Sequence, residues 1–386
     1  MKYLMNTLTV SRFHGLDFLR AMAMLLGLVF HAPMLYYIPI MADGFKEFGI
    51  SSETMPEMEQ WLSLLVQWLH SWRMSVFFTI SGFFTALVLS RRTLRAFITD
   101  RFIKIGLTMI LFAALYDFLD GQFDGKLEHI WFLYYLMIFS ILACGLSLAG
   151  LIASEETCQS SHNPGDQGSY FGSIKQLLLL AFVLVVIRPI CDVLDGGAIT
   201  VATDYFSIKI GGFLYFWIWF CAGLWLFKNQ SLLTSGKGLF AVIALGIVSI
   251  IIFVFLSPYL TGVFGYNALK PDTLFDFMTL SLLKGVNTLA WTAFLILITH
   301  RLIVKTHKPI TWFVTLSYPI YLFHLFPCMI VSAILIGLGL SQAGVVIGTV
   351  VAAFAISVAL YYVLVKFTPL SWLILGYKKS WLQPFR

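Results

Sequence analysis

The sequence predicts an all-α, polytopic membrane protein with about ten transmembrane helices and both termini in the cytoplasm. Of its 386 residues, 59% are hydrophobic and 11% are charged, whereas soluble domains carry about 25% charged residues. The apolar residues fall in long runs, and an α-helix needs about 20 such residues to cross a bilayer. Because the basic residues lie between these runs, the net charge of +6 does not indicate binding to nucleic acid.

Ten apolar segments are long enough for transmembrane helices, and most loops between them are short. We therefore interpret residues 1–386 as a single integral membrane domain. The largest polar insertion, residues 154–173, has the Gly, Pro, Ser and Asn content of a flexible linker. The expected helices lie at residues 16–40, 61–89, 101–119, 130–152, 174–190, 210–227, 239–256, 273–299, 312–336 and 343–365.

The distribution of Lys and Arg sets the expected orientation. With the N-terminus inside, 17 of the 25 Lys and Arg residues lie on the inner side and five lie on the outer side. The other three, Arg20, Arg73 and Lys284, fall within apolar segments. This excess of basic residues predicts that both termini face the cytoplasm.

The five cysteines show no close pairing and no Cys-x-x-Cys motif. We therefore expect no disulfide framework, no zinc site and no permanently bound cofactor. The first apolar run is too long for the core of a signal peptide, so we expect a retained helix there.

The first predicted helix carries polar groups at two depths. Asp17 and Arg20 are spaced i, i+3 near its inner end and can pair. Ten uncharged residues separate Arg20 from His31. At 1.5 Å and 100° per residue, the two side chains lie about 16 Å apart along the axis and within about 20° of the same face. This spacing predicts the beginning of a site.

Further ionisable side chains are expected at the depth of His31. Counting along the predicted helices places them between the midplane and the outer face, where ionisable residues are usually functional. A structural role remains open for each one, and for His70 we favour a hydrogen bond within the bundle. The side chains at this depth are His31, His70, Arg73, His129 and His324.

Four stretches resemble the acyltransferase 3 family of membrane O-acyltransferases. The first is residues 16–20 (LDFLR), followed after ten residues by His31. The others are residues 73–83 (RMSVFFTISGF), 129–133 (HIWFL) and 317–324 (SYPIYLFH). They occur in the order found in that family, so the resemblance covers essentially the whole chain.

Within this family, the phrases AMLLGLVFH, WRMSVFFTISGFF and HIWFL are similar to the branch that succinylates osmoregulated periplasmic glucans, the glucan biosynthesis C proteins. One departure concerns the third helix, where the family often has Arg-x-x-Arg and this chain has Arg101 and Lys104. Arg92 and Arg95 keep the pattern one loop earlier. Lysine retains the charge but not the bidentate geometry of arginine.

The resemblance implies that acyl-CoA, with succinyl-CoA as the expected form, is the co-substrate and enters from the cytoplasm. Its phosphates require cations on the inner side, and Asp17 with Arg20 lies on the way in. The residues implied for the donor phosphates are Arg92, Arg95, Arg101 and Lys104.

The resemblance also implies the chemistry in the outer half of the membrane. His31 is expected to act as general base on a sugar hydroxyl. Arg73 is expected to stabilise the oxyanion or to hold the distal carboxylate of a succinyl group. The acceptor mouth is expected to involve His129, Trp131, Tyr321 and His324, with Trp131 stacking on a sugar face.

The expected partners are acyl-CoA, a periplasmic glucan or another envelope polysaccharide, and the lipid bilayer of a bacterial inner membrane. Direct transfer and a covalent intermediate both stay open. An O-acetyltransferase acting on another envelope polysaccharide is the alternative within this class. A transporter or flippase is the alternative from another class, because buried His and Arg residues also suit a transport pathway.

Overall fold

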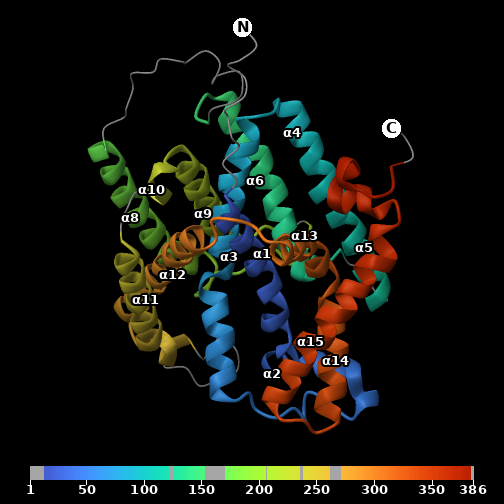
Figure 1. The fold of residues 1–386 in the computed structure, drawn as a ribbon. Coiled ribbons are helices and arrows are strands. Elements are labelled where there is room, and N and C mark those ends of the chain that lie inside the picture. The colour runs from blue at the N-terminus through green and yellow to red at the C-terminus, as the bar shows by residue number, and fades with distance from the viewer. Residues whose placement is uncertain are drawn as a thin grey trace.

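The computed structural model describes residues 13–121, 125–152, 170–205, 207–234, 238–260 and 271–383. Most of the predicted linker at residues 154–173 lies outside these ranges. In the described part of the chain, the only β pairing is an isolated bridge between Lys126 and Asp204. The fold is therefore all-α, as the sequence predicts (Figure 1).

The helices keep the labels of Figure 1. The first half of the chain forms α1 (His14–His31), α2 (Met34–Tyr37), α3 (Gln60–Leu89), α4 (Leu94–Arg101), α5 (Thr108–Asp120) and α6 (Trp131–Leu148). The second half forms α8 (Tyr170–Leu194), α9 (Ile210–Lys228), α10 (Ser231–Thr234), α11 (Leu239–Leu260), α12 (Leu274–Leu302), α13 (Lys308–Phe323), α14 (Leu325–Gly337) and α15 (Gln342–Leu360). Short 3₁₀ or π segments are η1 (Pro39–Phe48), η2 (Phe102–Leu107), η3 (Glu128–Ile130), η5 (Tyr361–Lys366), η6 (Trp372–Gly376) and η7 (Tyr377–Lys379).

Nine of the ten predicted segments correspond to membrane-spanning candidates. Within the described residues, eight helices are long and apolar enough to cross a bilayer, and the bent pair α13 and α14 makes a ninth. The first segment differs, because α1 ends at His31 and not near residue 40. Pro33 has no N–H and its ring crowds the carbonyl four residues earlier, so the helix cannot continue. His31 therefore lies at the end of α1.

The long helix α3 forms the centre of the bundle. Its 30 residues include an apolar stretch that is 78% buried, and its main neighbour is α9. The two backbones approach closely at glycines, because a Cβ on Gly82 would lie 2.0 Å from the Phe220 carbonyl oxygen. A Cβ on Gly223 would lie 1.8 Å from the Thr79 carbonyl oxygen. Small residues at such crossings are typical of membrane helices.

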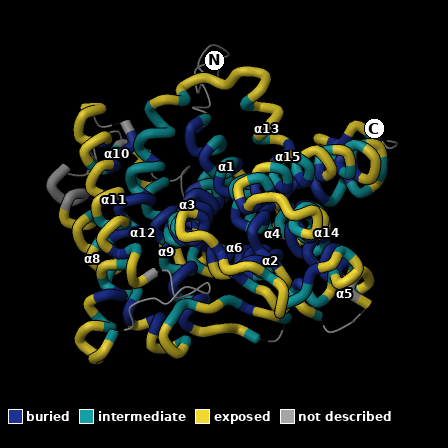
Figure 2. The backbone as a smooth tube through the Cα atoms, turned by 90° about the horizontal axis from the view of Figure 1, so that it is seen from below, coloured by how far each residue is buried: buried dark blue, intermediate teal, exposed yellow. Residues whose placement is uncertain are grey.

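The outer helices expose apolar side chains. The apolar stretches of α8 and α11 are each only 22% buried, and Phe240 and Phe255 on α11 are 85% and 79% exposed. Figure 2 shows α8 and α11 at the rim and the buried backbone around α3 in the middle. This arrangement suits helices that face lipid around a packed centre.

The helix break between α13 and α14 positions the site. The two helices are bent by 70° at His324. Pro319 lies inside α13 without ending it. Pro327, in contrast, lies four residues after Phe323 and has no N–H for the Phe323 carbonyl, so the helical hydrogen bonds stop at this point. At this break the carbonyl groups of Tyr321 and Leu322, at the end of α13, accept hydrogen bonds from side chains.

Candidate active site

Two histidines share one of the carbonyl groups at the end of α13. The Nε2 atom of His129 lies 3.0 Å from the Tyr321 carbonyl oxygen, and the Nδ1 atom of His324 lies 2.6 Å from the same oxygen. A carbonyl only accepts hydrogen bonds, so both nitrogens carry the proton. In the neutral rings, the opposite nitrogens then carry lone pairs. His129 Nδ1 and His324 Nε2 are both buried and have no partner among the described residues.

Tyrosine hydroxyls fix this arrangement from two sides. Tyr116 donates to the Leu322 carbonyl, the next freed carbonyl of α13. Its hydroxyl also lies 3.4 Å from His129 Nε2. Tyr321 donates back to the His129 carbonyl. The α13 terminus and the η3 turn before α6 are therefore locked together by reciprocal hydrogen bonds.

His31 completes a cluster of three imidazoles. Its ring centroid lies 5.2 Å from that of His324 and 6.1 Å from that of His129. It forms no hydrogen bond with a described residue, and its Nδ1 is buried without a partner. Unlike His324, which is fully buried, His31 is partly exposed. It is therefore the histidine of this cluster that a substrate can reach most directly.

Arg73 brings a positive charge to the same place. The residue is only 8% exposed, its guanidinium lies 4.6 Å from the centroid of the Phe30 ring, and its NH1 has no partner among the described residues. A Cβ placed on Gly27 would lie 3.5 Å from Arg73 NH1 and 3.4 Å from His324 Nε2. The two unpartnered nitrogens thus converge on the space that the glycine of α1 leaves open.

No described group of three or more His, Cys, Asp or Glu side chains is arranged to hold a metal ion. In the three-histidine cluster, two of the six ring nitrogens point at one carbonyl oxygen. The arrangement suits proton transfer and anion stabilisation instead: free imidazole lone pairs can accept a proton, and a buried guanidinium can stabilise a developing negative charge.

His70 lies beside this cluster and not in it. Its ring stacks on Phe30 with a centroid distance of 5.8 Å, whereas His31 meets the same Phe30 ring edge-on at 5.1 Å. Phe30 therefore separates His70 from His31. His70 is exposed although most of α3 is buried.

The predicted inner cations differ in whether a carboxylate pairs with them. Arg20 pairs with Asp17 at 3.1 Å, as the i, i+3 spacing predicts, and its guanidinium lies 4.9 Å from the Phe84 ring centroid. Lys104 pairs with Asp100 at 2.6 Å. Arg101 lies over the Phe97 ring, and its buried Nε has no partner among the described residues. Part of the positive charge is thus already neutralised by carboxylates.

Arg92 and Arg95 lie on the surface. Arg92 is 3.9 Å from Asp100, which it shares with Lys104, and both arginines are exposed at the start of α4. The structure therefore brings Arg92 near Asp100, the carboxylate that pairs with Lys104. Among the described residues, no ion pair or hydrogen bond ties Arg95 to Arg92, Asp100 or Lys104.

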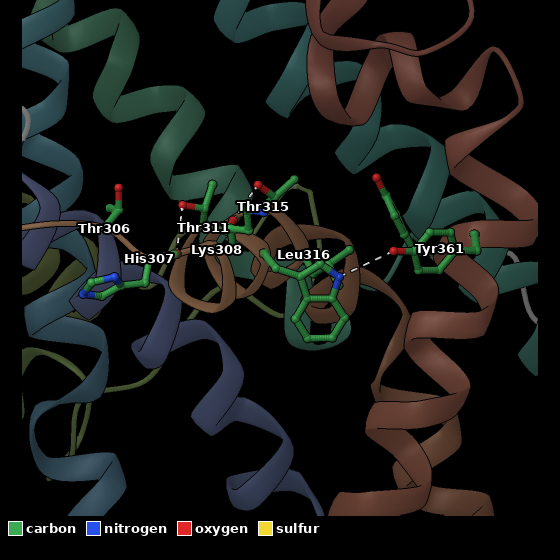
Figure 3. Close-up of a pocket in the computed structure, with 9 residues that line it drawn as sticks. Thr306, His307, Lys308, Thr311, Thr315, Leu316 and Tyr361 are labelled. Carbon is green, nitrogen blue, oxygen red and sulfur yellow. Dashed lines mark hydrogen bonds between the residues drawn. The ribbon is translucent and has the colours of Figure 1, made fainter.

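A pocket of about 520 Å³ opens between α13 and η5. Figure 3 shows Lys308, Thr311 and Thr315 on α13 and Tyr361 across from them. Trp312 also lines the pocket and donates from Nε1 to the Tyr362 hydroxyl at 3.5 Å. The pocket thus combines aromatic faces, hydroxyl groups and cations, but none of its residues was predicted from the sequence.

The pocket is connected to the inner cations through α13. Tyr318 donates to the Lys104 carbonyl at 2.9 Å, which holds α13 against η2. Lys366 lies 4.6 Å from the centroid of the Tyr362 ring. From Leu316 in the pocket to His324 in the cluster, α13 advances about 12 Å at 1.5 Å per residue. One helix therefore joins the pocket to the histidines.

Trp131 packs among aromatic rings, and its expected stacking on a sugar face stays a prediction. Its ring packs against Phe216 and Tyr135, each at a centroid distance of 5.5 Å. It lies in the apolar interface of α6 with α9, and no ring contact joins it to the three histidines in the described chain. The structure therefore gives Trp131 a packing role.

Sequence reasoning missed three residues that shape the cluster. Gly27 leaves the open space, Tyr116 orients the carbonyl groups and Pro327 ends α13. Pro327 could have been found, because a proline interrupts the bonding of a helix four residues upstream. Gly27 and Tyr116 carried no such signal, because their role depends on which helices meet.

Comparisons with known proteins show which family the chain resembles. A family model described as an acyltransferase domain matches residues 13–363. Proteins named glucans biosynthesis protein C from Escherichia coli strain K12 and Escherichia coli O1:K1 / APEC are each 30% identical over 162 residues. The match covers 36% of this chain and 40% of each relative, so it spans well under half of their length. No solved structure matches the chain.

Proposed function

Because the chain belongs to the acyltransferase 3 family, we propose that it transfers an acyl group, with succinyl as the expected form, from cytoplasmic acyl-CoA to a hydroxyl of a periplasmic glucan. The observation that carries the proposal is the convergence of Arg73 NH1 and His324 Nε2 at Gly27, beside the partly exposed His31. The relatives' name supports a glucan acceptor. The excess of Lys and Arg on one side supports an inner-membrane protein with cytoplasmic termini.

In the proposed reaction, a sugar hydroxyl attacks the thioester carbonyl carbon. His31 accepts the hydroxyl proton as the C–O bond forms. The carbonyl oxygen becomes an oxyanion that the Arg73 guanidinium stabilises, and a single donor of this kind is worth about 10²–10³ in kcat. The C–S bond then breaks and the ester remains on the sugar. CoA leaves as the thiolate and takes the proton from the His31 imidazolium.

The proton transfer is supported by the positions of three neighbouring residues, His129, His324 and Tyr321. The hydrogen bonds to the Tyr321 carbonyl fix the tautomers of His129 and His324, so their lone pairs point away from α13. His324 Nε2 is then an acceptor for a hydroxyl near His31. We assign acceptor binding to His129, Tyr321 and His324, and we do not extend it to Trp131.

The donor is proposed to lie along α13. An adenine ring suits the aromatic pocket of Trp312 and Tyr362, where Lys308 and Lys366 supply nearby charge. The diphosphate suits Arg101 and Lys104, with Arg92 at the surface. The pantetheine arm would follow α13 toward His324, and Arg20 lies on the same inner side.

The proposal is tested with the purified full chain in detergent, acyl-CoA and a neutral β-glucan. We expect release of free CoA that depends on the glucan, and mass spectrometry should find an ester on the glucan. Replacing succinyl-CoA with acetyl-CoA identifies the acyl group. CoA release without an acceptor product would show thioester hydrolysis and contradict acyl transfer to a glucan. No turnover with either donor would contradict it as well and would favour a transport role.

A further inference from the structure

A second group of ionisable side chains lies within the bundle, outside the cluster of three histidines. It consists of Arg188 on α8, Lys284 on α12 and His70 on α3. These three helices pack together, with α12 lying between α8 and α3 (Figure 1). A Cβ on Gly285 would lie 3.3 Å from Arg188 Cβ, so the backbone next to Lys284 is in direct contact with Arg188.

The other side of α12 reaches the helix that carries His70. Thr288 donates to the Ser71 carbonyl at 2.8 Å, and it also donates to the Lys284 carbonyl at 3.0 Å. Lys284 and Arg188 both lie within electrostatic reach of the His70 ring. The helices that carry the three side chains therefore meet directly at the level of Lys284.

The charges of this group do not balance. Asp192 is fully buried and accepts two hydrogen bonds from Arg188 Nε, at 3.0 and 3.1 Å. A third comes from the Ile199 N–H at 3.1 Å. The Asp192 charge is thus matched by Arg188. Lys284 forms no ion pair with any residue that the structure describes, so one positive charge remains.

The Lys284 ammonium group, which has no ion pair among the described residues, indicates a binding site for an anion. Lys284 lies ten residues, or about 15 Å, from the start of α12. Charged side chains inside a membrane are costly and usually mark a substrate path or pair with another charge. His70, on the neighbouring helix α3, is exposed.

We propose that Lys284, with Arg188, binds an anionic group of a substrate, a carboxylate or a phosphate ester. The catalytic consequence rests on the proposed acyl transfer, because the two sites are neighbours across Phe30, whose ring contacts both His70 and Arg73. The anion comes either from the distal carboxylate of a succinyl donor or from an acidic substituent of the acceptor. In both cases Lys284 selects acidic substrates over neutral ones.

Binding is tested first, without turnover. Calorimetric titration of the purified full chain in detergent with succinate, and separately with inorganic phosphate, should show saturable binding. Lys284→Gln removes one charge-assisted hydrogen bond and should raise the Kd about 10–100-fold. Lys284→Arg should keep the Kd within about threefold. Lys209→Gln is the matched control, because this exposed lysine lies outside the group and its loss should leave binding unchanged.

The source of the anion is identified by kinetics with four substrate pairs: succinyl-CoA or acetyl-CoA, each with a neutral or an acidic glucan. A loss of about 10–100-fold in kcat/KM confined to succinyl-CoA assigns the site to the donor. A loss confined to the acidic glucan assigns it to the acceptor. An equal loss with all four pairs, or unchanged succinate and phosphate binding in Lys284→Gln, would overturn the inference. If the wild-type chain transfers no acyl group, the proposed function fails. The binding experiment then still tests whether Lys284 binds an anion.

Discussion

Gly27 shows how a residue without a side chain can leave space at a candidate active site. The nearest atoms to a Cβ at this position are His324 Nε2 and Arg73 NH1, at 3.4 and 3.5 Å. These are ordinary contact distances, so a methyl group fits without a clash. In the proposed reaction it would, however, occupy the space in which the thioester carbonyl approaches Arg73.

We therefore predict that Gly27→Ala folds but loses activity. Alanine in a helix is about 0.5–1 kcal/mol more favourable than glycine, so the thermal midpoint should be equal or higher. The kcat should fall by about tenfold or more, because Arg73 can no longer reach the oxyanion. Gly145→Ala on α6 is the control, since its Cβ would meet nothing within 4 Å. Full activity of Gly27→Ala would place the reacting carbonyl elsewhere.

At the scale of the helices, the close packing of α3 against α9 holds half of the site in place. Arg73 and His70 belong to α3, and their position depends on its contact with α9. This contact is made through the backbone at Gly82 and Gly223. A larger side chain at either glycine would push α3 and α9 apart. Because Arg73 belongs to α3, a shift of α3 would move Arg73.

Gly223→Ala should consequently destabilise the protein. The added Cβ would lie 1.8 Å from the Thr79 carbonyl oxygen, and a backbone group cannot move aside as a side chain can. Overpacking of this kind typically costs about 1–3 kcal/mol, which should appear as a lower thermal midpoint in detergent. Gly145→Ala serves again as the control and should be neutral or slightly stabilising. Equal midpoints for the two variants would show that α3 and α9 do not pack as described.

For the whole molecule, the proposal requires that donor and acceptor arrive from opposite sides. This can be measured in inverted membrane vesicles, which expose the cytoplasmic face and enclose the periplasmic one. Acyl-CoA added outside should acylate glucan that was loaded inside. If acylated glucan forms only when both substrates share one compartment, transfer across the membrane is excluded.

The depth of the site could be predicted from the sequence, because the rise per residue of a helix is fixed. That rule placed His31, Arg73, His129 and His324 at one level, and the structure brings these four together. The fold class followed from the length and apolarity of the segments, and all but the first correspond to spanning candidates.

The lateral arrangement could not be predicted, because it depends on which helix faces meet. His70 shares the depth of the cluster but lies on the far side of Phe30. Trp131 is two residues from His129 in the sequence, yet it packs toward α9. The pocket of Trp312 and Tyr362 combines α13 with η5, about 50 residues apart in the chain, and no local pattern connects them.

The central claim is that the partly exposed imidazole of His31 takes the proton in the transfer step. The most direct test is kcat for His31→Gln, with succinyl-CoA and glucan saturating and with the variant present at wild-type abundance. His14→Gln, at the other end of the same helix, is the control and should keep wild-type activity. We predict that kcat for His31→Gln falls about 10²–10⁴-fold while the KM for the acyl-CoA stays unchanged. A folded His31→Gln protein with kcat within threefold of wild type would contradict the account.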